Sequence, residues 1–161
     1  MPDWLASGFS LVGLAIVVLQ QIPGIIWALR PPKRDPFAQN SGTLLVEILE
    51  KTFGIATILL LVVVFARASL LPGLSTAFLV GAFVVLAAYY ALYVLYYFGV
   101  TSLPVLLGMA AFPPLTFLLL ALHQGNYPAV VTSVVFGAVH VGLTYTKLGP
   151  GSHQGLRAKL D

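Results

Sequence analysis

The feature that most constrains this fold is a series of long apolar runs, separated by short breaks rich in proline, glycine and charge. A helix needs roughly 20 mostly apolar residues to cross a bilayer. Five runs approach or exceed that length, at residues 5–29, 43–66, 74–98, 101–122 and 129–147. An open sheet would leave unpaired backbone groups in lipid, and the runs are too long and too evenly apolar for barrel strands. The sequence therefore predicts an all-α fold, a polytopic integral membrane helical bundle with about five transmembrane helices.

The composition agrees with this prediction and narrows the function. Only 8% of the 161 residues are charged, whereas a soluble domain typically carries about 25%. The net charge of +3 is too small for a nucleic-acid surface, so we expect no nucleic-acid partner. Cysteine is absent, and neither an H-E-x-x-H nor a G-x-S-x-G motif occurs. We therefore assign no cofactor, no metal site and no catalytic residue, and an enzyme is not the favoured class.

Basic residues predict how the helices are threaded. Cytoplasmic loops of membrane proteins are enriched in Lys and Arg. With five spans, one side holds all but one of the basic residues that flank them: Arg30, Lys33, Arg34, Lys147, Arg157 and Lys159. Only Arg67 falls on the other side. We expect the N-terminus outside and the C-terminus in the cytoplasm, most simply in the plasma membrane. Residues 1–148 then form the transmembrane domain, and residues 149–161 form a polar cytoplasmic tail.

Three charged residues stand near the start of the second run. Glu47, Glu50 and Lys51 precede an apolar stretch that is too short to cross the bilayer alone, so the helix must begin before them. Together with Gly54 they share one helix face. One interpretation is an i,i+4 pair between Glu47 and Lys51 at the interface. The other is a charged vestibule or proton site that faces the bundle interior.

Two amides lie slightly past the middle of the first run. Gln20 and Gln21 precede Pro23 and Gly24, a combination that predicts a bend because proline frees a carbonyl one turn back. The amides can satisfy that freed backbone, bond between helices, or bind a polar ligand.

His140 lies near the middle of the fifth run, on a stripe of small and polar residues with Ser133, Gly137 and Thr144. Such a stripe should face protein or water. Three hypotheses remain open: a neutral histidine bonded across helices, a titrating group, or a metal or cofactor ligand, for which the signal is weak because nothing places a second histidine nearby.

Two further patterns mark the third and fourth runs. Five tyrosines, which include Tyr93, fill the end of the third run. They predict either an interfacial belt with packing or an aromatic wall for a lipophilic or cationic ligand. Pro113 and Pro114 remove two successive backbone donors near the centre of the fourth run, which predicts a second bend.

The favoured hypothesis is a small membrane protein that binds or transports a small or lipophilic solute through an internal polar cavity. The candidate ligand-binding residues are Gln20, Gln21, Glu47, Glu50, Tyr93 and His140. The alternatives are a structural or accessory subunit of a membrane complex, and an intramembrane enzyme that uses Glu47, Glu50 or His140 as acid or base. The expected partners are the lipid bilayer and a small or lipophilic ligand, with a homo-oligomer or a larger membrane complex left open.

Overall fold

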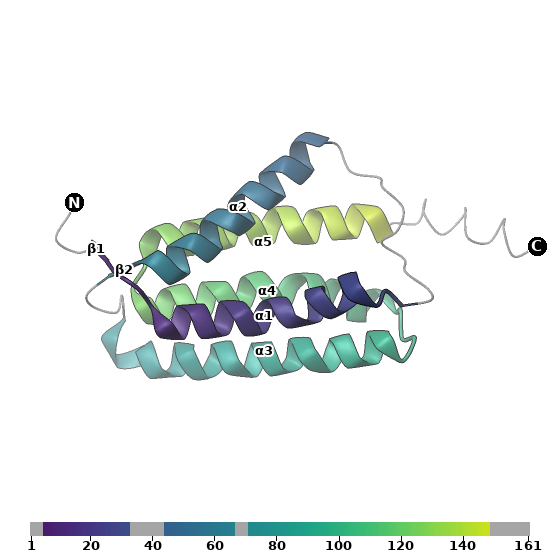
Figure 1. Cartoon of the computed structure of the whole chain (residues 1–161), viewed down its shortest axis with the longest axis horizontal. Coiled ribbons are helices and arrows are strands. Elements are labelled where there is room, and N and C mark those ends of the chain that lie inside the picture. The colour runs from purple at the N-terminus through teal and green to yellow at the C-terminus, as the bar shows by residue number, and fades with distance from the viewer. Residues whose placement is uncertain (1–4, 33–43, 67–70, 149–161) are drawn as a thin grey trace, which may run out of the picture.

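The computed structural model describes residues 5–32, 44–66 and 71–148, and it shows five helices that run in alternating directions (Figure 1). They are α1 (Leu11–Leu29), α2 (Leu44–Val63), α3 (Ser75–Tyr97), α4 (Leu103–Gln124) and α5 (Tyr127–Leu148). A short 3-10 turn, η1 (Pro72–Leu74), precedes α3. This confirms the predicted all-α helical bundle.

Four of the five helices, α1, α3, α4 and α5, are long and apolar enough to cross a membrane. The protein is therefore an integral membrane protein. The helix α2 is as long as α1, but its first half carries Glu47, Glu50 and Lys51. Because of these three charges, α2 is not among the helices that are long and apolar enough to cross a membrane.

The bundle is built around α4 and α5. Helix α3 packs against α4, α4 packs against α5, and α5 packs against α2, whereas α1 makes fewer contacts with its neighbours. Gly137 lets α5 approach α4 closely, because a Cβ atom there would lie 3.1 Å from the Cβ atom of Pro114. The main core cluster includes Ile16, Leu61 and Phe117, one each from α1, α2 and α4. Large apolar side chains are exposed along the outside of the helices, which suits a surface that faces lipid.

At one end of the bundle, the terminal carbonyl groups of α2 all accept hydrogen bonds from other segments of the chain. The last four carbonyls of a helix have no partner within the helix, and lipid cannot supply one. Here each of the four accepts a hydrogen bond from another segment. The donors are Asn126 Nδ2 to Leu60 (2.7 Å), Gln124 Nε2 to Leu61 (3.1 Å), the Ser10 N–H to Val62 (2.9 Å) and the Gly8 N–H to Val63 (3.0 Å). We call this arrangement the closed end.

The closed end also explains why α1 and α2 are shorter than predicted. The chain from Leu5 is not helical: β1 (Leu5–Ser7) pairs antiparallel with β2 (Val64–Ala66). Helix α1 begins only at Leu11, where the Ser10 side chain caps it by accepting a hydrogen bond from the Gly13 N–H (3.0 Å). The predicted spans 5–29 and 43–66 therefore each lose their outer residues at this end, because backbone pairing between the two segments replaces helix.

The other three predicted spans agree with the observed helices to within two residues at each boundary. The largest differences are at α4 and α5. Gly125 takes a left-handed conformation (φ 68°) that ends α4, and the Asn126 side chain accepts from the Ala129 N–H (3.2 Å) at the start of α5. Tyr127 and Pro128, which precede the predicted span 129–147, therefore lie in the first turn of α5.

The prolines are accommodated within continuous helices. Helix α1 runs through Pro23, and α4 runs through Pro113 and Pro114. Pro23 cannot donate to the carbonyl of Leu19. The hydroxyl of Tyr90 on α3 donates to that carbonyl instead (2.7 Å). A tyrosine from a neighbouring helix, and not the adjacent glutamines, thus satisfies the freed backbone group.

Several predictions fall on residues outside the described part of the chain. These are the first residue of the predicted span 43–66, the basic residues Lys33, Arg34 and Arg67, and the tail at 149–161.

Candidate functional site

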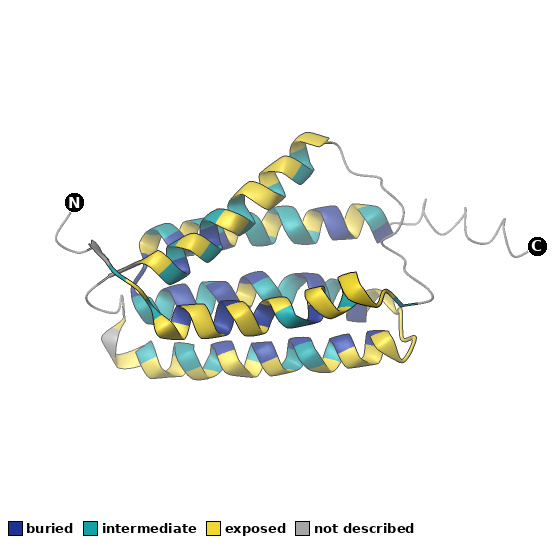
Figure 2. Ribbon diagram, viewed as in Figure 1, coloured by how far each residue is buried: buried dark blue, intermediate teal, exposed yellow. Residues whose placement is uncertain are grey.

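The amino-terminal half of α2 diverges from the bundle, in contrast to the closed end (Figure 1). The first buried residue of α2 is Thr57, and the preceding turns are exposed or half-buried (Figure 2). A cavity of about 410 Å³ lies beside this half of α2. It is bordered by all five helices, and α1 and α2 contribute most of the lining.

The lining of this cavity is mainly apolar with a few polar groups. Gln20, Gln21 and Gly24 come from α1, and Glu50, Lys51, Gly54, Ile55 and Ile58 come from α2. The other helices contribute aromatic and ring side chains together with the histidine: Tyr89, Pro113, Phe117, Phe136 and His140. Four of the six predicted site residues, Gln20, Gln21, Glu50 and His140, therefore meet at one cavity.

Gln20 is the most unusual of these side chains. It is only 3% exposed, yet neither its Nε2 nor its Oε1 atom has a hydrogen-bond partner. The Tyr89 hydroxyl comes near without making a bond of normal geometry. An unpaired buried amide costs about 1–3 kcal/mol. The cavity therefore contains an unused donor and an unused acceptor on one side chain.

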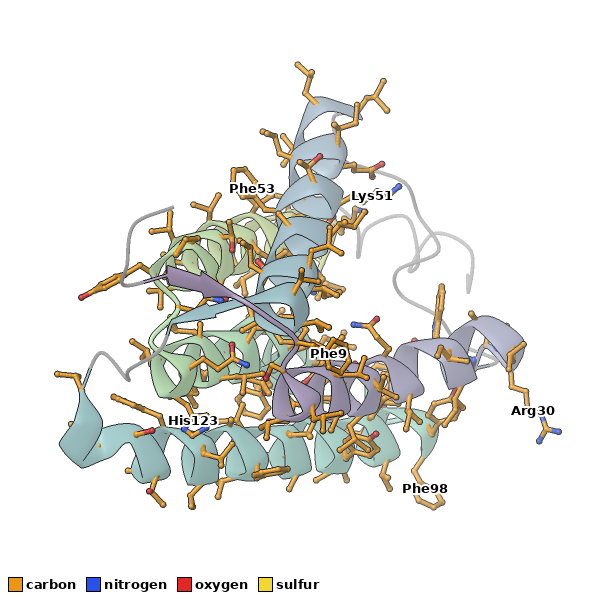
Figure 3. The ribbon with its side chains drawn as sticks, turned by 60° about the vertical axis from the view of Figure 1, so that its left-hand side comes forward. Phe9, Arg30, Lys51, Phe53, Phe98 and His123 are labelled. Carbon is orange, nitrogen blue, oxygen red and sulfur yellow. The ribbon has the colours of Figure 1, made fainter. Side chains whose placement is uncertain are left out.

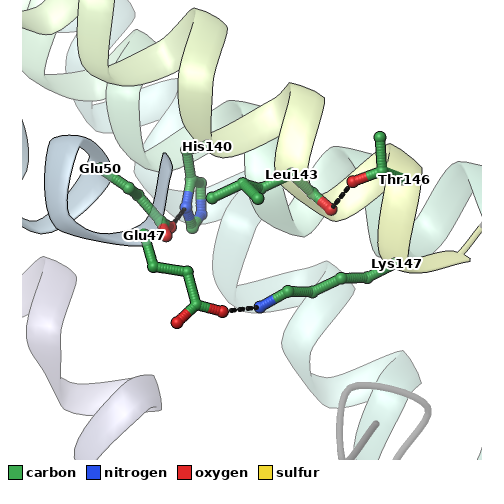
Figure 4. Close-up of polar contacts among 6 residues, drawn as sticks. All are labelled: Glu47, Glu50, His140, Leu143, Thr146 and Lys147. Atoms are coloured by element: carbon green, nitrogen blue, oxygen red, sulfur yellow. Dashed lines mark hydrogen bonds and ion pairs between the residues drawn. The ribbon is translucent and has the colours of Figure 1, made fainter. Parts of the chain in front are cut away.

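Glu50 and His140 form the second polar feature. The Nδ1 atom of His140 on α5 is hydrogen-bonded to Oε1 of Glu50 on α2 (Figure 4). The contact joins α5 to α2, as one of the three hypotheses for His140 expected. The imidazole also stacks on Phe136, one turn earlier on α5, with ring centroids 5.1 Å apart. Two independent contacts therefore fix the orientation of the ring.

A second cavity of about 260 Å³ also borders this pair. Glu50 and His140 line both cavities. The second cavity is otherwise bordered by residues of α1, α4 and α5: Trp27, Leu106, Met109, Ala110, Leu143, Thr144 and Lys147. The Glu50–His140 contact is thus shared by two cavities of the bundle.

Glu47 does not pair with Lys51, contrary to the i,i+4 interpretation. Its Oε1 atom lies 3.3 Å from Nζ of Lys147 on α5 (Figure 4). Both acidic residues of α2 therefore bond across to α5, because their helix face is turned toward that helix. Lys51 is exposed and forms no ion pair with any described residue, and its side chain projects away from the α2 ribbon (Figure 3).

Tyr93 lies away from both cavities. It is buried in an aromatic cluster with Leu86 and Tyr89, and its ring is tilted or edge-on to the rings of its tyrosine neighbours. Glu47 also lies outside both linings. Sequence reasoning missed Gly54 and Phe136 as lining residues. Each lies one helical turn from a predicted site residue, Glu50 or His140, and that spacing is the signal that would have indicated them.

No protein-family model matches the chain, and no curated protein or solved structure shows significant similarity to it. Within the described residues, no group of three His, Cys, Asp or Glu side chains is placed to hold a metal ion.

Proposed function

We propose that this protein binds a small or lipophilic solute in the cavity between α1 and α2, and that Gln20 is the group that recognises it. The cavity volume of about 410 Å³ falls within the range of small-molecule sites, about 300–1,000 Å³. Its lining has the usual character of such sites, apolar walls with a few polar groups. A carrier that transports the solute would need the same site.

The observation that carries the proposal is the buried Gln20 amide without a partner. A site that presents one donor and one acceptor is complementary to an amide-like group, which offers one of each. Solutes without such a group would leave Gln20 unpaired, and sites of this kind reject them. We therefore propose an apolar solute that carries an amide or a closely similar polar group.

The fluorescence of Trp27 provides the test, because this side chain borders the adjoining cavity. In a Trp4→Phe variant Trp27 is the only tryptophan. The probe is 12-bromododecanamide, whose bromine quenches tryptophan on contact, added to protein in phosphatidylcholine nanodiscs. We expect saturable quenching, and we expect Gln20→Leu to weaken the apparent affinity about tenfold, since one amide pair is lost. Gln124→Leu is the matched control because Gln124 lies at the closed end. Equal quenching curves for the parent and Gln20→Leu would contradict the proposal.

The contact between Glu50 and His140 favours a second candidate, an intramembrane enzyme. A carboxylate that orients a histidine beside an open cavity is the arrangement of a general base. Among the described residues, neither cavity lining contains a serine or cysteine, so His140 would act on water, on the solute or on the hydroxyl of Thr144 in the second cavity. Under this candidate His140→Gln would retain binding of a substrate and abolish its turnover. Under the binding proposal the same variant changes affinity only.

We also propose that the end of the bundle with Arg30, Lys51 and Lys147 faces the cytoplasm, across the plasma membrane. The alternating helix directions bring these three described cations to one end, which supports the positive-inside assignment. Gly73→Cys at the opposite end should react with a membrane-impermeant maleimide in intact cells. Arg30→Cys should react only after lysis, and the reverse pattern would show that the orientation is wrong.

A further inference from the structure

One basic side chain at the cavity is not held in an ion pair. Three ionisable side chains of α2 and α5 line it: Glu50, Lys51 and His140. Glu50 is already bonded to His140, and Glu47, one turn away, is bonded to Lys147. Lys51 is the charged lining residue that forms no ion pair among the described residues, although it is near enough to Glu50 to interact with its charge. An anionic group is therefore the kind of charge that Lys51 would bind at the rim of the cavity.

Lys51 and Gln20 lie at different depths of the same cavity. Gln20 is buried, whereas Lys51 is exposed at the rim. A solute whose amide reaches Gln20 can therefore place a second polar group near Lys51 only if that group lies at its outer end. The order of groups along such a solute is an apolar body, an amide-like group and then an anionic end.

The surroundings of the rim indicate where such a solute comes from. Next to the rim, α1 and α2 expose large apolar side chains, among them Ile25 (55%), Ile55 (60%) and Leu59 (56%). In a membrane protein these side chains face acyl chains. Gly24, at the rim on α1, has no atom within 4 Å of the position of an added Cβ atom. The opening between the two helices is therefore bordered by lipid, with Lys51 as its polar edge.

From these observations, and resting on the proposed function, we infer that the solute is a single-chain anionic amphiphile of the N-acyl amino acid type. Its amide pairs with Gln20, its carboxylate lies at Lys51, and its acyl chain occupies the apolar lining. The class is defined by this chemistry: an acyl chain, one amide and one carboxylate.

Three brominated probes with the same 12-bromododecanoyl chain separate these requirements. The N-acylglycine has the amide and the carboxylate, its methyl ester has the amide without the charge, and the free fatty acid has the charge without the amide. Binding is measured by quenching of Trp27 in the Trp4→Phe background, in phosphatidylcholine nanodiscs that contain no anionic lipid. Comparing variants with one probe at a time removes differences in partition between the probes.

We expect Lys51→Gln to weaken binding of the N-acylglycine about fivefold, as a partly exposed ion pair implies, and to leave the methyl ester unchanged. Lys51→Arg should restore the affinity. Arg30→Gln is the matched control, because it removes the same charge from the same end and Arg30 lines neither cavity (Figure 3). Gln20→Leu should weaken both amide-containing probes and should have little effect on the fatty acid.

Two results would overturn the inference and leave the proposed function standing. One is Gln20-dependent binding of both amide probes that Lys51→Gln does not change. The other is an equal loss in Lys51→Gln and Arg30→Gln, which would indicate only a general attraction of anions to the basic end. If none of the probes shows Gln20-dependent binding, the inference and the proposed function both fail.

Discussion

The two ends of the α1–α2 pair differ in how their polar groups are satisfied. At the closed end every terminal carbonyl of α2 accepts a hydrogen bond, and Gly13 brings α1 against the backbone of α2 at Leu61. Toward the other end the helices separate around a cavity, and the Gln20 amide has no partner. Buried polar groups in native proteins are nearly always bonded. The difference indicates that the closed end holds α1 and α2 together. The half of the pair around Gln20 and the cavity, which we call the open half, is shaped for something other than stability.

The two glycines of α1 provide the strongest test of this comparison. A Cβ atom at Gly13 would collide with the carbonyl oxygen of Leu61, which is backbone and cannot rotate away, whereas one at Gly24 meets nothing within 4 Å. We expect Gly13→Ala to lower the free energy of unfolding by about 3 kcal/mol or to prevent folding. Gly24→Ala should raise it by up to about 1 kcal/mol, because alanine is the better helix former. Denaturation by SDS in mixed micelles measures both, and similar effects of the two variants would mean that the ends do not differ.

Gln20, which is buried, and Gln124, which is half-buried, should respond to the same substitution with opposite signs. Gln124 Nε2 donates to Ser10 Oγ (2.9 Å) and to the Leu61 carbonyl (3.1 Å), although its own oxygen is unpaired. Gln124→Leu should therefore cost about 1–2 kcal/mol, since it leaves the Leu61 carbonyl without its donor. Gln20→Leu removes two unpaired atoms and should stabilise the empty protein by about 1 kcal/mol. Thermal unfolding in detergent checks both, and destabilisation by Gln20→Leu would show that this amide has a structural partner.

Part of this architecture follows from the sequence and part does not. Apolar run length predicts the helices, because lipid leaves few alternatives for the backbone. The strand pair of Leu5–Ser7 with Val64–Ala66 was not predictable, since a three-residue pairing has no periodic signature and depends on the closed end being assembled. In the same way, the position of His140 predicted a polar partner, but the choice of Glu50 depends on how α2 packs against α5.

The roles of the aromatic residues were the least predictable. Tyr93 belonged to a cluster that suggested a ligand wall, yet it packs in the core. Tyr90, its neighbour one turn earlier, bonds to the carbonyl that Pro23 leaves free. The two tyrosines are three residues apart on α3, and the rotation of α3 against its neighbours distinguishes their roles. A single sequence does not encode that rotation in any local pattern.

The bond between Tyr90 and Leu19 gives the smallest expected effect and tests how α1 is held beside the cavity. Tyr90→Phe removes the donor and should cost about 0.5–1 kcal/mol. If the bond matters because Pro23 lacks an N–H group, the cost should nearly vanish in a Pro23→Ala background, where the backbone N–H of the introduced alanine can donate to the Leu19 carbonyl. The double-mutant cycle isolates this coupling from the packing change that Pro23→Ala also causes. An equal cost of Tyr90→Phe in both backgrounds would mean that the hydroxyl serves packing at the α1–α3 contact, and that the open half of α1 is held in some other way.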